Sequence, residues 1–556
     1  MKMKGARIVI ETLIELGVTD VFGYPGGQVI DIYDEIYNCS DRINHYLTAH
    51  EQGAAHAADG YARATGKVGV VIATSGPGAT NLVTGIATAQ LDSVPMIAIT
   101  GNVSRALIGK DSFQEIDITG ITLPITKHNY FVNRIEDLSD CIREAFKIAT
   151  SGRPGPVLID IPKDIQNAEY EYEVRPVPAK FPNKQPSSSS IEKAIRIIDS
   201  AKRPYIYIGG GVIGASAEKL IIKLAEKVDG YIGCSLMGIS AIPTDYERFL
   251  GMQGMHGHYA SSMALSAADV IIAVGVRFSD RATGNKEKFA TSAKIVHIDL
   301  DFAEINKNID CSVGVIGDIK ESLSEIISGI SQKNNTEWHA QVAALRAEEK
   351  SFVKRTDRLT PDKVMRIINA IKDADTPVAT DVGQHQMWAA QYCSFEKPRK
   401  FISSGGLGTM GFGMGAAIGA ATGTGHRTVL ITSDGSFGMN LNELATAVTY
   451  NVPLTIVLLN NGVLGMVRQW QTLFYGKRYS NTTLDRHTDF VKLAEAFGAE
   501  GIRTSNEEEF RSAFKKAYKS GRPVVIDCII DKDEFVLPML PPGGSIENII
   551  VDTEGM

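Results

Sequence analysis

Two oxygen-bearing side chains, Asp434 and Asn461, are the clearest candidates for chemistry in this sequence. Each follows a run of mainly aliphatic residues (RTVLIT and PLTIVLLN) that is typical of a buried strand. Asn461 lies 27 positions after Asp434, which leaves room for one helix and the next parallel strand, so both side chains are expected at the same edge of a sheet. Carboxylate and amide oxygens are ligands that Mg²⁺ prefers, together with water and phosphate oxygens. The pair therefore predicts a metal site that can hold a phosphate-bearing ligand.

The segment after Asp434 supports the phosphate part of this prediction. Gly435 and Ser436 form a small-residue turn, and the NLNELATAV that follows is typical of a helix. A helix that opens at a strand end presents unpaired N–H groups, which favour an anionic phosphate. Asp-Gly and Asn-Gly are also among the commonest turn dipeptides, so each alone would indicate only a turn. Together they resemble the fingerprint of thiamine-diphosphate enzymes, in which an Asp-Gly precedes a paired Asn; Ser433 replaces the usual first glycine.

Glu51 is the second candidate, in the segment TAHEQGAAHAADGYARATG. Thiamine chemistry needs a carboxyl group beside N1′ of the aminopyrimidine ring, and an apolar site would raise the pKa of that group enough for it to share a proton. The small residues after Glu51 would let a flat ring approach, whereas a solvated glutamate at a helix start is the ordinary alternative. ATSGPGATN (73–81) follows about 20 residues later, across a predicted strand. The two segments together resemble the pyrimidine-binding domain of thiamine-diphosphate decarboxylases.

The elements that must position these residues are short strands alternating with longer helices. Runs such as KVGVVIATS, PVLIDI and DVIIAVGV recur between helical patterns, which predicts parallel sheets covered by helices. Residues 175–190, with four prolines and four consecutive serines, and the highly charged residues 331–361 are expected as linkers. We therefore predict an α/β fold with three open parallel-sheet domains. Their expected limits are 1–175, 190–330 and 360–540, followed by a tail over 541–556.

Composition narrows the classes of function. Of 556 residues, 44% are hydrophobic and 22% are charged, and the net charge of −7 comes from interspersed residues rather than blocks. No basic stripe of the kind that binds nucleic acid is visible, and the longest uncharged stretch, 401–425, has too few strongly apolar residues for a membrane span. The six cysteines lie far apart without CxxC spacing, which argues against zinc and disulfides and favours a reducing compartment. We expect a cytoplasmic protein that binds neither nucleic acid nor membrane.

Longer stretches carry a narrower resemblance, which covers nearly the whole chain. They are similar to segments of the large, catalytic subunit of biosynthetic acetohydroxyacid synthases, also called acetolactate synthases: VFGYPGGQVIDIYD, KDSFQEIDITGITLPITKHNY, GVRFSDRATG, DVGQHQMWAAQ, GGLGTMGFGMGAAIG and NNGVLGMVRQWQ. The resemblance implies a transferase that decarboxylates pyruvate on thiamine diphosphate and joins the two-carbon remnant to a second pyruvate or to 2-ketobutyrate, in branched-chain amino acid biosynthesis. It also implies Mg²⁺ and FAD as cofactors.

The same resemblance assigns roles to single residues. Gly27 would let backbone approach the reacting carbon, and Met410, otherwise read as core packing, would hold the cofactor bent. Arg281, otherwise a surface ion pair with Asp280, would bind the carboxylate of the acceptor. Trp470 would shape the acceptor pocket, where one methylene is worth about 1–3 kcal/mol. The other positions are Gln114 and Lys163 in the substrate channel; Val382, Gly383, Gln384, His385, Gly435, Ser436 and Met466 around the diphosphate-bearing cofactor; and Val463 with Asp434 and Asn461 at the metal.

The middle block contains YIGGGV (207–212), GMHG (254–257) and HIDLD (297–301). A single GGG turn is weak support for a dinucleotide site, and only the resemblance makes this block a predicted FAD-binding domain in which the flavin has a structural role. Met237 stands where many relatives carry a glutamine, a departure that concerns one flavin hydrogen bond. The predicted flavin contacts are Arg153, Gly210, Gly211, Met255, Gly275 and Arg277.

Other functions stay open at this point. A FAD-dependent pyruvate oxidase or another thiamine-dependent 2-keto acid decarboxylase is the nearest alternative, and Trp470, Arg281 and KDSFQE argue against it. The middle-block motifs disfavour a flavin-free catabolic synthase, and a non-catalytic relative would be expected to lose Glu51, Asp434 or Asn461. Because the acid and the metal pair lie on domains that meet across a subunit interface in this family, the resemblance implies a homodimer or homotetramer. It also implies a small regulatory subunit, and the proline- and glycine-rich tail is expected to fold over the site.

Overall fold

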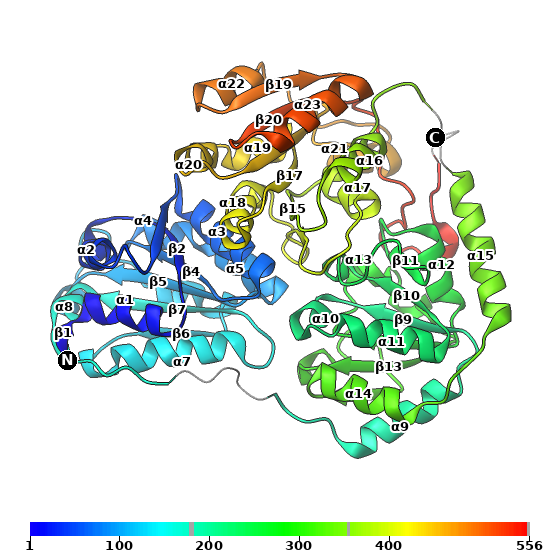
Figure 1. The fold of residues 1–556 in the computed structure, drawn as a ribbon, viewed down its shortest axis with the longest axis horizontal. Helices are drawn as coiled ribbons and strands as arrows, with labels where there is room; N and C mark the ends of the chain where they lie inside the picture. The colour runs from blue at the N-terminus through cyan, green and yellow to red at the C-terminus, as the bar shows by residue number, and fades with distance from the viewer. Residues whose placement is uncertain (177–182, 353–355, 553–556) are drawn as a thin grey trace.

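The computed structural model describes residues 1–176, 183–352 and 356–552, and contains three six-stranded parallel sheets with helices on both faces (Figure 1). This architecture confirms the predicted α/β class with three open parallel sheets. The expected linker at 175–190 lies partly outside the described residues. No helix in the described part of the chain is long and apolar enough to cross a membrane.

The first sheet carries the N-terminal candidates. Its strand order is β3 (Asn44–Leu47), β2 (Asp20–Tyr24), β4 (Gly69–Ala73), β5 (Met96–Asn102), β7 (Pro156–Pro162) and β6 (His128–Phe131). The central strands are buried on both faces, which is why they read as continuous apolar runs. Helices α1 (Gly5–Glu15) and α7 (Leu138–Thr150) cover one face, and α3 (Glu51–Thr65) and α5 (Val83–Asp92) cover the other. A short antiparallel pair, β1 (Lys2–Lys4) with β8 (Glu169–Glu171), ties the chain start to the end of this domain.

The middle sheet has the order β11 (Phe249–Met252), β10 (Tyr231–Cys234), β9 (Pro204–Ile208), β12 (Val270–Val274), β13 (Lys294–Asp299) and β14 (Val313–Ile316). Helices α9 (Ser188–Asp199), α11 (Glu218–Val228) and α14 (Ile319–Gly329) pack on one face, and α12 (Tyr259–Ala267) packs on the other. The expected linker at 331–361 contains a helix, α15 (Thr336–Ser351). Only Trp338 and Val342 of α15 are buried, so most of this helix is exposed and its sequence shows little helical periodicity.

The third sheet has the order β16 (Phe401–Ile402), β15 (Val378–Thr380), β17 (Thr428–Ser433), β18 (Leu454–Asn460), β20 (Val524–Ile529) and β19 (Glu500–Thr504). Helices α16 (Pro361–Ile371), α17 (Gln384–Tyr392) and α23 (Glu507–Lys519) lie on one face. The other face is covered by α18 (Phe412–Thr424), α20 (Glu443–Thr449) and α22 (Phe490–Ala496).

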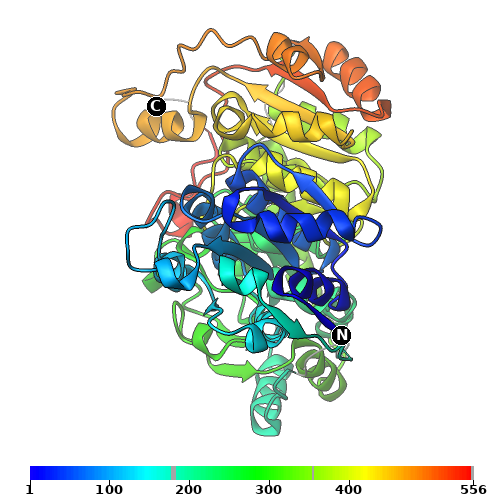
Figure 2. The same ribbon diagram turned by 90° about the vertical axis from the view of Figure 1, so that its left-hand side faces the viewer.

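Helices α3 and α18 pack against each other between the first and third domains, with their backbones in close contact. A Cβ added to Gly419 would lie 1.8 Å from the carbonyl oxygen of Ala57, and one added to Gly60 would lie 2.1 Å from that of Ala416. Only glycine permits so close an approach. Figure 2, in which the first domain faces the viewer, shows its blue helices lying against the yellow elements of the third domain.

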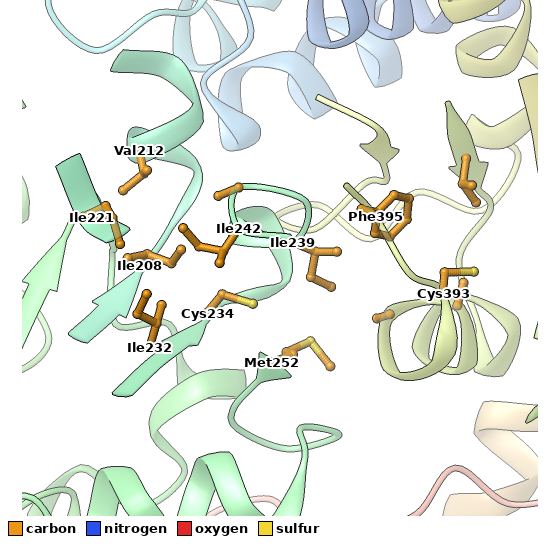
Figure 3. Close-up of a cluster of buried hydrophobic side chains, with 14 of the residues drawn as sticks. Ile208, Val212, Ile221, Ile232, Cys234, Ile239, Ile242, Met252, Cys393 and Phe395 are labelled. Carbon is orange, nitrogen blue, oxygen red and sulfur yellow. The ribbon is translucent and has the colours of Figure 1, made fainter. Parts of the chain in front are cut away.

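The middle and third domains share one hydrophobic core. Figure 3 shows Ile239, Ile242 and Met252 of the middle domain beside Phe395 and Cys393, which follow α17. The described part of the C-terminal segment, 531–552, has no regular element longer than a short 3-10 turn, η8 (Ile546–Asn548). It crosses from the third domain to the middle domain, where the Leu540 amide donates to the Met255 carbonyl at 2.7 Å.

Candidate functional site

The carboxyl edge of the third sheet brings Asp434 and Asn461 together, as their spacing predicts. Asp434 is the first residue of α19 (Asp434–Asn440) directly after β17, and Asn461 follows β18, the neighbouring strand. Burial raises the pKa of Asp434 to about 6, while the amide N–H groups of Gly435 and Gly462 oppose the rise. Its buried Oδ1 has no hydrogen-bond partner. An unpaired buried carboxylate oxygen is costly, and a cation would relieve that cost.

Asn461 and Val463 form the second half of this candidate metal site. The amide of Val463 donates to the Asn461 Oδ1 at 3.2 Å, which folds the chain tightly after β18. No group of three or more His, Cys, Asp or Glu side chains suited to a metal occurs in the described ranges 1–176, 183–352 and 356–552. The donor set at Asp434 is therefore one carboxylate with amide and backbone oxygens, which suits a hard cation such as Mg²⁺ rather than zinc.

A glycine turn faces these ligands from the next strand end. Gly383, at a φ of +149°, precedes α17, and the Ser436 hydroxyl donates to the Val382 carbonyl at 2.8 Å. His385 is buried, burial lowers its pKa to about 3, and its Nε2 lacks a partner. A small cavity of about 70 Å³ lies here. Its lining includes eight of the predicted residues, namely Val382, Gly383, Gln384, His385, Met410, Asn461, Val463 and Met466.

Glu51 lies at the corresponding edge of the first sheet, as the first residue of α3. Asn81 Nδ2 donates to Glu51 Oε2 at 2.9 Å. A Cβ added to Gly78 would lie 3.3 Å from Glu51 Oε1, so the Gly-Pro-Gly turn and the acid are neighbours in space. This position is both a helix start and a half-buried site, so the structure combines features of the two interpretations made from the sequence.

The substrate-channel candidates of the first domain gather around the same edge. Lys163 Nζ, just after β7, donates to the Gly27 carbonyl at 2.9 Å and pairs with Asp31 at 2.6 Å. Gln114 has a positive φ of 61° and lies against Gly76, where an added Cβ would meet the Gln114 Cβ at 2.8 Å. No residue of the first domain lines the small cavity of the third domain. Glu51 therefore does not border the cavity beside Asn461 in the same chain.

Arg281 and Trp470 meet although they come from different domains. Arg281 is in α13 (Asp280–Thr283) of the middle domain and Trp470 is in α21 (Gly465–Phe474) of the third. The guanidinium carbon lies 5.6 Å from the Trp470 ring centroid, within the range of a cation–π contact. The ion pair with Asp280 is long, at 3.9 Å, and the Arg281 side chain remains 61% exposed. The guanidinium therefore keeps hydrogen-bonding capacity for an anionic ligand.

The predicted flavin contacts surround a second and much larger cavity. It has a volume of about 1280 Å³ and lies between the domains. Four of its lining residues have a buried polar atom without a hydrogen-bond partner: the Tyr207 hydroxyl, Gln253 Nε2, His256 Nδ1 and Glu304 Oε2. A Cβ added to Gly211 would lie 2.6 Å from the Gly275 Cα, so the two turns are packed backbone to backbone. The cavity lining includes all six predicted residues, Arg153, Gly210, Gly211, Met255, Gly275 and Arg277, and also Met237. Its size and its walls, which are mainly apolar but include several arginines and the glycine turns, fit a dinucleotide.

Two buried acids of the site region escaped prediction. Glu443 of α20 accepts from the His50 amide at 2.9 Å and from the Ala49 amide at 3.2 Å, and thereby holds the backbone before Glu51. Burial raises the pKa of Glu443. Asp92, at the end of α5, accepts from the amides of a loop in the third domain. Neither acid has a local sequence signal, because the partner in each case lies more than 300 positions away.

Comparison with known proteins defines the class first. Three family models match the chain: the N-terminal TPP binding domain of thiamine pyrophosphate enzymes over residues 3–121, their central domain over 191–326 and their C-terminal TPP binding domain over 381–528. The fold is thus that of a thiamine pyrophosphate enzyme, with an N-terminal and a C-terminal TPP binding domain.

Three curated relatives narrow this class. The chain is 46% identical to a probable acetolactate synthase large subunit of Methanocaldococcus jannaschii (99% of this chain, 95% of the relative) and 46% identical to the acetolactate synthase large subunit of Corynebacterium glutamicum (99% and 90%). It is 42% identical to the acetolactate synthase isozyme 3 large subunit of Escherichia coli (98% of both). The chain belongs to the family of acetolactate synthase large subunits.

Proposed function

We propose that this chain decarboxylates pyruvate and joins the remaining two carbons to a second 2-keto acid, pyruvate or 2-ketobutyrate, as a step of branched-chain amino acid biosynthesis. Within the family, the observation that carries the choice of reaction is the contact of Arg281 with Trp470. It sets a planar cation beside a large aromatic wall, about one helical turn beyond Met466 of the small cavity. The planar cation can bind the carboxylate of the acceptor, and the aromatic wall can limit the length of the acceptor's alkyl chain.

The cofactors proposed are thiamine diphosphate, Mg²⁺ and FAD. Asp434, Asn461 and the Val463 carbonyl would hold Mg²⁺, while Gly383 to His385 with Gly435 and Ser436 would hold the diphosphate. When bound, the thiazolium ring accepts the electron pair released as carbon dioxide leaves. Arg153, Arg277 and the turns at 210–211 and 275 would hold the flavin in the large cavity. This assignment is supported by the unpartnered Oδ1 of Asp434, which directly follows Ser433 of the small cavity, and by the unpartnered Gln253 Nε2 at the large cavity.

The chain's own groups bind, orient and move protons. Asn81 fixes Glu51 Oε2 and leaves Oε1 beside Gly78 to exchange a proton with the aminopyrimidine ring. Gly27 presents open space, since nothing lies within 4 Å of a Cβ added there, so backbone can approach the reacting carbon. Arg281 orients the acceptor by its carboxylate. The packing of 531–552 across the middle and third domains supports a role for this segment in keeping water out.

We infer that two copies of the chain are needed to complete each site, in a homodimer or a homotetramer. Glu51 does not line the small cavity of its own third domain. Three large apolar side chains are exposed close in sequence to site residues: Phe113 at 84%, next to Gln114, Met439 at 63%, in α19, and Val467 at 52%, which lines the small cavity. Burial of these side chains against another chain would be favourable. A second copy would cover them and place Glu51 of one chain against the cofactor held by Asp434 of the other.

Further assignments concern a partner subunit, the location of the protein and its domain limits. The relatives are named as large subunits, and a small regulatory subunit is therefore proposed as a partner. All six cysteines are free thiols, which favours a reducing, cytoplasmic location. The limits 1–175, 190–330 and 360–540, with a tail over 541–556, are retained as the proposed domain boundaries.

The first experiment identifies products. Purified protein is incubated with pyruvate, Mg²⁺, thiamine diphosphate and FAD, with and without 2-ketobutyrate, and products are identified by mass while oxygen uptake is recorded. Acetolactate, with acetohydroxybutyrate when 2-ketobutyrate is present, and little oxygen uptake is the expected result. Acetate or acetyl phosphate with stoichiometric oxygen uptake would instead identify an oxidase. Glu51→Gln is expected to abolish turnover with an unchanged circular dichroism spectrum, and near-normal acetolactate formation by this variant would refute its role.

A mixing experiment tests the shared site. Glu51→Gln and Asp434→Asn are each expected to be inactive alone, and the two proteins are co-expressed with different tags and purified as the mixed assembly. If sites form across chains, one site of each heterodimer combines an intact Glu51 with an intact Asp434, and activity returns. If each site forms within one chain, no intact site exists and the mixture stays inactive.

A further inference from the structure

One loop of the third domain, residues 403–411, reaches both cavities. Gly405 and Gly406 line the large cavity assigned to the flavin, and Met410 lines the small cavity at the diphosphate site. Only a few residues separate the two contacts, so a change in the path of the loop at one cavity is close enough to reach the other. We call residues 403–411 the bridging loop.

Asp92 of the first domain holds the bridging loop at the flavin side. Its Oδ2 accepts from the Gly405 amide at 3.0 Å and its Oδ1 accepts from the Gly406 amide at 2.7 Å. The Asp92 side chain is fully buried. A Cβ added to Gly406 would lie 2.8 Å from Asp92 Oδ1, so the carboxylate sits directly against the loop backbone. Charge-assisted bonds of this kind are short and strong in a dry environment.

Buried charges around Asp92 fix its orientation. Arg63 Nη2 donates to Asp92 Oδ2 at 2.9 Å, and Arg63 Nη1 donates to the Ser403 carbonyl at 2.9 Å. Asp59 pairs with the same guanidinium. Arg277 of the middle domain approaches Asp92 at 4.0 Å, and it also donates to the Leu91 carbonyl. Charged side chains of the first and middle domains and backbone groups of the third domain therefore meet at the wall of the large cavity.

The far end of the bridging loop is held by different contacts. The hydroxyls of Thr88 and Thr409 are 2.8 Å apart, and the Gly411 amide donates to Asp381 Oδ1 at 2.7 Å. Asp381 directly precedes the glycine turn at Val382 and Gly383. Thr88 and Asp92 lie one helical turn apart on α5, so one helix of the first domain sets both ends of the loop.

We propose that the bridging loop couples the two cofactor cavities, and that Asp92 is the positioning residue for this coupling. The proposal rests on the cofactors assigned under the proposed function. A flavin in the large cavity packs on the wall made by Gly405, Gly406 and Arg277, and so favours the loop path that Asp92 holds. That path places Met410 in the small cavity, where it contacts thiamine diphosphate. Each cofactor therefore binds more tightly when the other is present, by the same factor in both directions.

The test measures this factor directly on the full-length protein. FAD is titrated by the quenching of its fluorescence, with and without saturating thiamine diphosphate and Mg²⁺; thiamine diphosphate is then titrated calorimetrically with and without FAD. We expect each affinity to rise about 5-fold or more when the other cofactor is present. Asp92→Asn keeps the side-chain shape but puts an NH₂ group where a carboxylate oxygen accepted a hydrogen bond from a loop amide. In this variant the ratio of the affinities measured with and without the other cofactor should fall below about 2-fold.

Asp160→Asn is the matched control. Asp160 is also an acid of the first domain, 1% exposed and bonded to neutral donors, and none of its bonds reaches the bridging loop. This variant should keep the wild-type ratio. Thr88→Val, which removes the contact with Thr409, is the second test variant and decides the question if Asp92→Asn does not fold; its ratio should also fall.

The outcomes separate the coupling from the cofactor assignment. A wild-type protein that binds FAD equally well with and without thiamine diphosphate would overturn the coupling alone. The coupling would also be overturned if Asp92→Asn kept the wild-type ratio of affinities, or if Thr88→Val kept it when Asp92→Asn does not fold. A wild-type protein that binds no FAD at all would overturn the flavin assignment itself, and the coupling with it.

Discussion

Asp160 gives a prediction whose size can be worked out from its surroundings. It lies at the carboxyl end of β7, 1% exposed, where it accepts from the Thr100 hydroxyl at 2.7 Å and from Asn102 Nδ2 at 2.6 Å. Burial, with a smaller contribution from the nearby charge of Asp117, raises the pKa of Asp160 from 3.8 to about 7. The two donors oppose this rise but do not cancel it.

The sign of the effect on stability follows from proton binding. Because the folded pKa lies above the unfolded pKa, the native state binds the extra proton between about pH 4 and pH 7. The contribution of Asp160 to stability is fully present below pH 4 and is lost as the pH rises to 7. A difference between 3.8 and about 7 corresponds to at most about 4 kcal/mol, at about 1.4 kcal/mol for each pH unit. Above pH 7 the loss is complete.

Asp160→Asn removes this titration while keeping the size of the side chain. The amide oxygen can accept from Asn102, and the Thr100 hydroxyl can turn to accept from the new NH₂ group. Melting temperatures of wild type and variant are compared at pH 5 and pH 8, with Asp34→Asn on the exposed side of α2 (Ile30–Asn38) as the control. We expect the melting temperature of the variant, relative to that of the wild type, to be several degrees higher at pH 8 than at pH 5. A difference between the two proteins that is the same at both pH values would refute the reasoning.

Three further predictions concern the contacts between domains and the acceptor pocket. Glu443→Gln leaves one of the two amides before α3 without an acceptor, so the denaturant concentration at the midpoint of unfolding should fall by an amount equivalent to about 1–3 kcal/mol. An unchanged midpoint would show that Glu443 does not hold the backbone before Glu51. Gly419→Ala would place its Cβ 1.8 Å from the Ala57 carbonyl oxygen, so the melting temperature should drop sharply through overpacking of about 1–3 kcal/mol or more; an unchanged melting curve would show that the two helices can separate. Arg281→Lys should raise KM for the acceptor about 10-fold with little change in stability, because an ammonium lacks the planar fork; an unchanged KM would remove Arg281 from the acceptor site.

The rule that residues at the carboxyl ends of neighbouring parallel strands meet at one edge of the sheet predicted part of the site. Asp434 and Asn461 both follow buried apolar runs, and neighbouring parallel strands must bring their carboxyl ends to one edge. Gly383 and His385 were assigned through the family resemblance instead, although they too follow a strand, β15. The three-sheet architecture could be predicted because fully buried parallel strands read as continuous apolar runs.

The parts that could not be predicted depend on contacts between domains. Asp92 looks like an ordinary helix-ending acid, and only the folded chain brings the amides of Gly405 and Gly406 to it. Arg281 and Trp470 were assigned separately, but their contact required knowing how the middle domain sits on the third. Helix α15 was expected as a linker because its two buried residues, Trp338 and Val342, are too few to mark a helical face.

The packing of α3 on α18 also has a consequence for how the protein is made. Residues of α3 leave the ribosome about 350 positions before their partner helix does. At a synthesis rate of roughly 5–20 residues per second, the small apolar face of α3 waits about 20–70 seconds for its cover. During that time the nascent first domain displays an unprotected surface, and chaperones or faster translation would help to keep it from associating with other chains. The first domain expressed alone would keep that surface permanently, and it would be expected to aggregate.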